Sequence, residues 1–88
     1  MANHKSALKE HRQAVKRRQR NRIHRSRMRT AVKQFRQAVA AGDTGVAQGL
    51  LSATLALVDR TAKLGAIHDK AAARTKSRLT RAVNNLSA

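Results

Sequence analysis

The chain has 88 residues and a formal net charge of +16, with 20 Lys and Arg, four Asp and Glu, and neither cysteine nor proline. This length predicts one domain, residues 1–88. The missing cysteine excludes disulfides and thiolate metal sites, and no apolar run is long enough for a signal peptide or a transmembrane helix. Such a charge opposes compaction unless a polyanion neutralises it, so nucleic acid and an anionic membrane are the candidate partners.

The first predicted helix runs from residue 6 to residue 41, because no Gly or Pro interrupts it and Gly42 suits the position after a helix end. Ser6 is the preferred N-cap, with Asn3 as the alternative. At 1.5 Å per residue, this helix would be about 54 Å long. Only its C-terminal half has apolar residues at helical spacing, namely Ala31, Val32, Phe35, Ala38 and Val39. Upstream, the large apolar residues are too sparse to form a core-facing stripe.

Two shorter helices are predicted after Gly42. The second spans residues 44–64, with Asp43 or Thr44 as its N-cap, and the third spans residues 69–87, with Asp69 as its N-cap. Their inner faces are expected to contain Val46, Ala47, Leu50, Leu51, Thr54, Leu57, Val58 and Ala62, and then Ala72, Lys76, Leu79, Val83 and Leu86. Because the connecting loops are short, neighbouring helices should be antiparallel. The sequence therefore predicts an all-α three-helix bundle with a long, N-terminally extended first helix.

Positive charge is concentrated in residues 15–29, where eight of fifteen residues are Lys or Arg and none is acidic. On a helical wheel at about 100° per residue, Arg17, Arg18 and Arg22 point in different directions, so the charge encircles the helix. A helix on a membrane surface needs one apolar face, which this segment lacks. Folded RNA instead offers crevices with phosphates on several sides. The pattern therefore favours nucleic acid, and without it residues 6–27 should fray in part.

The single aromatic residue, Phe35, lies on the predicted core stripe, so stacking of bases on aromatic rings is not expected. Recognition should depend on phosphate geometry and shape. A few polar side chains on the first helix are candidates for contacts near bases: Gln13, Gln19, Asn21, Ser26 and Thr30.

Other functions fit the sequence less well. A histone-like, sequence-tolerant DNA-binding protein is the main alternative, because charge alone does not separate RNA from DNA. A basic zipper is disfavoured although Leu50, Leu57 and Leu64 repeat every seven residues, since residues 42–45 interrupt the helix that a zipper needs. The four acidic residues are far apart in the sequence and the histidines lack metal-ligand spacing. We therefore predict no enzyme, no metal and no cofactor.

Short motifs follow one another along the chain in a specific order: Met1-Ala2-Asn3, Lys5-Ser6-Ala7, Arg17-Arg18 with Asn21, Arg25-Ser26, Met28-Arg29-Thr30, Gly42-Asp43, Val58-Asp59-Arg60, Gly65, Ile67-His68, Ala72-Ala73-Arg74 and Lys76-Ser77-Arg78-Leu79. In this order and spacing the chain resembles the ribosomal protein S20 family of the bacterial small subunit over nearly its whole length. It departs from the family at Leu8 and Glu10, where basic residues are usual, and in Asp69-Lys70-Ala71, where Lys-Asn-Lys is more usual.

The resemblance implies a structural ribosomal protein whose first helix penetrates small-subunit ribosomal RNA. It also implies that the protein binds early in assembly and bridges the 5′ domain and the base of the long penultimate stem of that RNA. It also implies a monomer on a bacterial or organellar-type ribosome in the cytoplasm, with no membrane contact and few or no direct protein partners. Together with the basic stretch, it predicts RNA contacts by Lys5, Ser6, Lys9, Arg12, Lys16, Arg17, Arg18, Arg20, Asn21, Arg22, Arg25, Ser26, Arg27, Arg29, Thr30, Lys33, Arg74, Lys76, Ser77, Arg78 and Arg81.

Overall fold

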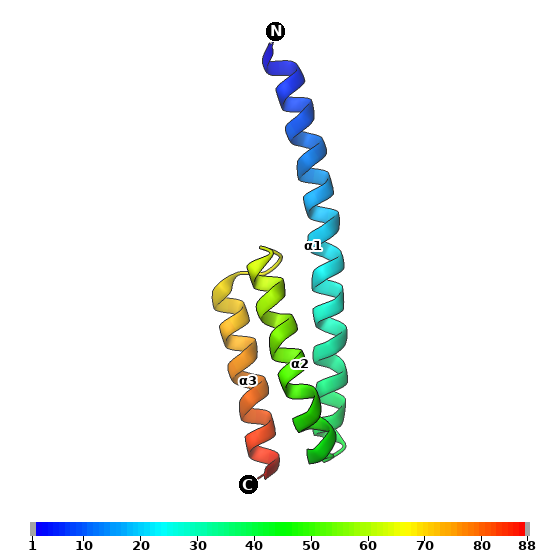
Figure 1. Ribbon diagram of the computed structural model, residues 1–88, viewed down its shortest axis with the longest axis vertical. Coiled ribbons are helices and arrows are strands. Elements are labelled where there is room, and N and C mark those ends of the chain that lie inside the picture. The colour runs from blue at the N-terminus through cyan, green and yellow to red at the C-terminus, as the bar shows by residue number, and fades with distance from the viewer. Residues whose placement is uncertain (1, 88) are drawn as a thin grey trace.

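The computed structural model describes the backbone of residues 2–87 and the side chains of residues 5–86; Met1 and Ala88 lie outside this range. Three helices account for nearly all of the described chain: α1 (Ala2–Ala40), α2 (Thr44–Lys63) and α3 (Asp69–Ser87). The helices run antiparallel in chain order, and α2 packs against both of its neighbours, whereas α1 and α3 contact each other little (Figure 1). This architecture confirms the predicted all-α three-helix bundle.

The helix α1 begins at Ala2, four residues before the predicted start at Ser6. No Gly or Pro precedes Ser6, and the Ala and Lys residues there favour helix, so both Ser6 and Asn3 lie inside α1 rather than capping it. The side chain of Asn3 is outside the described side chains. With 39 residues, α1 is about 58 Å long, close to the 66 Å longest dimension of the molecule. Its N-terminal half therefore projects far beyond the bundle (Figure 1).

Glycines end the first two helices in the same way. Gly42 has φ of +72° and Gly65 has φ of +79°, a region that residues with a Cβ atom rarely adopt. After α1, the Asp43 N–H donates to the Ala38 carbonyl over 3.1 Å, which closes a Schellman motif around Gly42. The corresponding bond forms around Gly65. These two positions reverse the chain and make the neighbouring helices antiparallel.

The N-caps of α2 and α3 differ from each other. At α2, the Asp43 side chain accepts from the backbone N–H three residues later over 3.2 Å, which confirms the predicted cap. At α3, the predicted cap Asp69 is wrong, because His68 Nδ1 accepts from the Lys70 N–H over 3.1 Å. Since α3 begins at Asp69 itself, the N-cap position falls on His68, and the Asp69 carboxylate instead lies in the first turn, where the helix dipole favours it.

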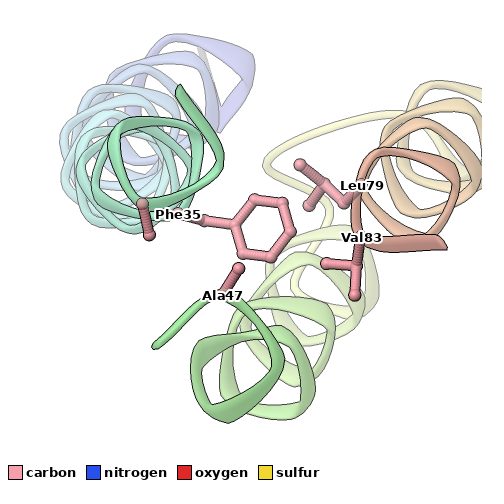
Figure 2. Packing of buried hydrophobic residues seen from close by; sticks show 5 residues of the cluster. Phe35, Ala47, Leu79 and Val83 are labelled. Carbon is pink, nitrogen blue, oxygen red and sulfur yellow. The ribbon is translucent and has the colours of Figure 1, made fainter. Parts of the chain in front are cut away.

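The core lies between the C-terminal part of α1 and the other two helices. Phe35 is fully buried and points from α1 toward Ala47 of α2 and toward Leu79 and Val83 of α3 (Figure 2). Partly buried apolar residues surround this cluster: Val32, Val39, Leu50, Leu51, Leu55, Ala82 and Leu86. The predicted stripe of α1 therefore forms one wall of the core, and Leu50 packs inside the molecule rather than in a zipper.

A second layer of the bundle contains two buried threonines on α2. Thr54 and Thr61 are buried beside Val58, and each hydroxyl donates to the backbone carbonyl four residues earlier over 2.7 Å. These bonds satisfy the hydroxyls within their own helix, so that neither of the two buried threonines has a hydroxyl without a partner. Small side chains at these positions allow α2 to pack between two neighbours.

The absence of a core along the N-terminal part of α1 leads to a prediction for the protein free of partners. No side chain in residues 5–27 is fully buried, so this segment depends mainly on the hydrogen bonds of the helix itself. We expect its amide protons to exchange at least about 100-fold faster than those of residues 35–39, which adjoin the core. Hydrogen exchange measured by NMR on the isolated chain tests this, and equal protection of the two segments would contradict it.

Candidate nucleic-acid interface

The most highly charged surface lies on residues 5–33 of α1, which we name the basic rod. Its Lys and Arg side chains are exposed, apart from the half-buried Arg25, and its single acidic residue is Glu10. The part of the rod beyond the bundle has no neighbouring helix on any side (Figure 1). All predicted contacts on the first helix therefore lie on one continuous rod, and its charge is accessible from several directions.

Shallow hollows between basic side chains run along the rod. The hollow nearest the bundle measures about 450 Å³, and its lining residues are spaced three or four apart, which places them on one helix face. Cations from successive turns converge on such a hollow, so that a phosphate seated there is within reach of several of them. This hollow is lined by Arg22, Arg25, Ser26, Arg29, Thr30 and Lys33, and two others are lined by Lys9, Arg12, Gln13, Lys16, Arg17 and Arg20.

The polar candidates on the rod do not all lie in these hollows. The Thr30 hydroxyl donates to the Ser26 carbonyl over 3.0 Å, and both residues line the hollow nearest the bundle. Gln13 lines the two outer hollows, Asn21 is half-buried, and Gln19 is exposed outside all three. Gln13, Ser26 and Thr30 are therefore the predicted polar contacts that line these hollows.

A second, smaller basic surface lies on α3, and we name it the α3 patch. Its members are exposed and spaced so that they share one helix face. Within the patch, Arg81 Nη2 donates to Ser77 Oγ over 2.8 Å, which holds the guanidinium beside the hydroxyl. The α3 patch consists of Arg74, Ser77, Arg78 and Arg81.

The predicted contact Lys76 lies in different surroundings from the α3 patch. Its Nζ atom is 2.9 Å from Asp59 Oδ1 of α2, and the two side chains are 38% and 58% exposed. A salt bridge this exposed contributes at most about 1 kcal/mol to stability. It nevertheless compensates the Lys76 charge, so Lys76 attracts a polyanion less strongly than the patch beside it.

The sequence interpretation missed Arg36, which is exposed and lies one turn after Lys33 and two turns after Arg29. These three side chains line one groove at the end of the rod. The neighbouring Phe35 led us to assign this turn to the core, although Arg36 lies on a different face of the same turn, about 100° around the helix. Arg36 follows the predicted contacts Lys33 and Arg29 by three and seven residues, and this helical spacing could have indicated that all three share one face.

The described residues offer little for other chemistry. No group of three or more His, Asp or Glu side chains among them is arranged to hold a metal ion. No helix in the same part of the chain is both long enough and apolar enough to cross a membrane.

Comparison with known proteins agrees with this geometry. The family model of ribosomal protein S20 matches residues 2–84. The chain belongs to the ribosomal protein S20 family. Small ribosomal subunit protein bS20 of Geotalea daltonii is 51% identical to it over 87 residues, which cover 99% of this chain and 100% of that protein. The proteins of the same name from Maridesulfovibrio salexigens and Desulfovibrio desulfuricans are 48% and 49% identical, with 99% and 100% of this chain covered.

Membership of the S20 family confirms the resemblance found in the sequence motifs. The relatives match over essentially their full length, so the match includes both the residues of the long first helix and those of the bundle. The chain is therefore a structural ribosomal protein and not an enzyme.

Proposed function

We propose that this chain binds small-subunit ribosomal RNA directly, bridges separate segments of it, and supports assembly of the small subunit. It acts as a monomer within the cytoplasmic ribosome and has few or no direct protein partners. The relatives are named as small ribosomal subunit proteins, which supports this setting.

The basic rod is the observation that carries the proposal. Its cations surround a helix that no other helix covers beyond the bundle, and Glu10 is the one acidic side chain among them. A flat anionic surface would neutralise one side of such a rod and leave the other side repelling itself. A crevice in folded RNA supplies phosphates on several sides and can neutralise charge around the rod.

Two basic surfaces on different helices support the proposed bridging function. The rod extends from one end of the bundle, whereas the α3 patch lies on a helix that contacts α1 little. One RNA segment bound along the rod and another bound at the patch would be held at a distance that the packing of the bundle determines. A protein that holds two RNA segments in this way favours the folded arrangement of the RNA over alternatives.

The salt dependence of binding tests direct recognition of phosphates. If about eight phosphates are neutralised, the logarithm of the affinity for folded small-subunit RNA should fall against the logarithm of the salt concentration with a slope of about −6 to −7. Filter binding at several salt concentrations gives this slope. An affinity that barely changes between low and physiological salt would contradict the proposal.

Competition with DNA separates the proposal from the histone-like alternative. We expect unlabelled small-subunit RNA to displace the labelled RNA at a concentration at least about 100-fold below that of duplex DNA with the same number of phosphates, because the rod needs phosphates from several directions. Equal competition by the two would favour a sequence-tolerant DNA-binding protein.

A further inference from the structure

A groove with an apolar floor and a basic rim lies on α1 at the end of the basic rod, and Thr75 of α3 closes its far side. It measures about 480 Å³, and its large apolar side chains are Met28 and Val32. We propose that this groove binds one unstacked base of the RNA, with the phosphate of that nucleotide held by Arg29 and Lys33. The proposal rests on the proposed function and specifies how one part of the RNA is recognised.

The groove exists because α1 and α3 share little contact, while α2 packs against both. At the level of Leu79, the fully buried ring of Phe35 fills the space between α1 and α3 (Figure 2). One turn earlier on α3 the side chain is the smaller Thr75, and the facing residues of α1 are Met28 and Val32. These three side chains are half-buried, so they line an open space rather than fill it.

The charge around the groove selects an anionic occupant. Arg29, Lys33 and Arg36 form its rim, and no acidic side chain lines it. Arg29 and Lys33 also line the hollow that contains Arg22 and Arg25, so the groove continues the proposed RNA surface of the rod. The floor of the groove fits an apolar surface and its rim fits an anionic group. A nucleotide has both, because its base has a flat apolar face and its phosphate lies at one side.

The size of the groove favours a nucleotide over an acidic protein segment. A volume of about 480 Å³ is within the usual range of small-molecule sites. An amphipathic helix docks through apolar anchors spread over at least two turns, whereas Met28 and Val32 are the large apolar side chains here and are only one turn apart. A short apolar floor flanked by guanidinium groups matches a single base.

The groove also explains how a chain with no Tyr or Trp, and with its single Phe buried, can contact a base. Planar guanidinium groups stack on bases much as aromatic rings do, and Arg29 and Arg36 are on the rim. Aliphatic side chains below the base exclude water from its other face. Shape and phosphate contacts then still dominate the affinity, and the groove adds a preference for an RNA with an unpaired base at one position.

Filling the groove without changing any charge tests the proposal. We expect Thr75→Leu to bind small-subunit RNA about tenfold more weakly, because one stacked base is lost, with an unchanged salt slope. Dimethyl sulfate probing of the RNA should show one base that the wild type protects and the variant leaves reactive. Thr80→Leu is the matched control, since Thr80 is also half-buried on α3 but does not line the groove; it should bind as the wild type does.

The outcomes distinguish this proposal from the proposed function. Wild-type affinity and an unchanged probing pattern for Thr75→Leu would overturn the base-binding groove while RNA binding stands, whereas a wild type that does not bind the RNA overturns both. A second readout needs no variant: the methyl signal of Met28 should move on RNA binding because a base ring lies over it. An unmoved signal overturns the proposal, as does a signal that moves with a polyglutamate peptide but not with RNA.

Discussion

Replacing Phe35 with alanine is expected to lower the free energy of unfolding by about 3–5 kcal/mol. Phe35 is fully buried, is the only aromatic residue of the chain, and contacts side chains from both other helices (Figure 2). Domains of this size have small cores and modest stability, so the variant should be largely unfolded at 37 °C. Urea unfolding followed by circular dichroism, at one fixed ionic strength, measures the change.

An exposed apolar residue provides the control for this substitution. Val46 was predicted on the inner face of the second helix but has 49% of its surface exposed on α2. Val46→Ala should therefore change the free energy of unfolding by less than about 0.5 kcal/mol. Phe35→Leu retains much of the buried volume and should lose less than the alanine variant. If Phe35→Ala unfolded at the same urea concentration as Val46→Ala, Phe35 would not be the centre of the core.

Removing four charges from the middle of the basic rod should weaken RNA binding by about 10³-fold near 0.1 M salt. The variant carries Arg17→Gln, Arg18→Gln, Arg20→Gln and Arg22→Gln, all at exposed positions that lie outside the core. Binding of the variant neutralises fewer phosphates and so releases fewer counterions from the RNA than binding of the wild type. The salt slope should therefore also become shallower by about three. Filter binding across a salt series gives both quantities.

The charge-retaining variant with lysine at the same four positions is the matched control. Lysine keeps the charge but loses the planar fork that grips a phosphate with two hydrogen bonds. We expect its salt slope to equal that of the wild type and its affinity to stay within about tenfold. Equal losses for the glutamine and lysine variants would mean that guanidinium geometry, and not charge, determines binding.

Phe35→Ala and the variant without four arginines change different parts of one helix. Isolated helices with strong self-repulsion are marginal in water, and the basic rod has no core of its own. The last turns of α1 pack through Phe35 and Ala38, which anchors the rod to the bundle and fixes its direction. Phe35→Ala should therefore weaken RNA binding indirectly, whereas the four Arg→Gln substitutions in the rod should leave the stability of the bundle nearly unchanged.

Several features of this fold are local and could be predicted from the residues. Gly42 and Gly65 end helices because they adopt positive φ at no steric cost, and Asp43 caps α2 through its own carboxylate. The N-cap of α3 could not be predicted in this way. Both His68 and Asp69 can accept from a backbone N–H, and the exact start of the helix, which depends on how the loop crosses the bundle, decides between them.

The same division holds for the candidate interface. The encircling charge of the rod is a property of one helix and is visible in its sequence, as are the spacings that place basic residues on one face. The pairing of Lys76 with Asp59 joins two helices, and the groove beside Arg36 needs α1 and α3 in their observed positions. Neither follows from the order of residues within a single helix.

The sequence by itself determined that this protein is helical, where its chain reverses, and that its first helix is a polycation, because helix propensity, glycine conformation and charge density act over a few neighbouring residues. Only the tertiary structure decided which side chains Phe35 contacts, that Thr61 is buried, and that a groove remains between α1 and α3. Those outcomes depend on how the side chains of three helices pack against one another. That packing involves residues far apart in the chain, so no single segment of the sequence determines it.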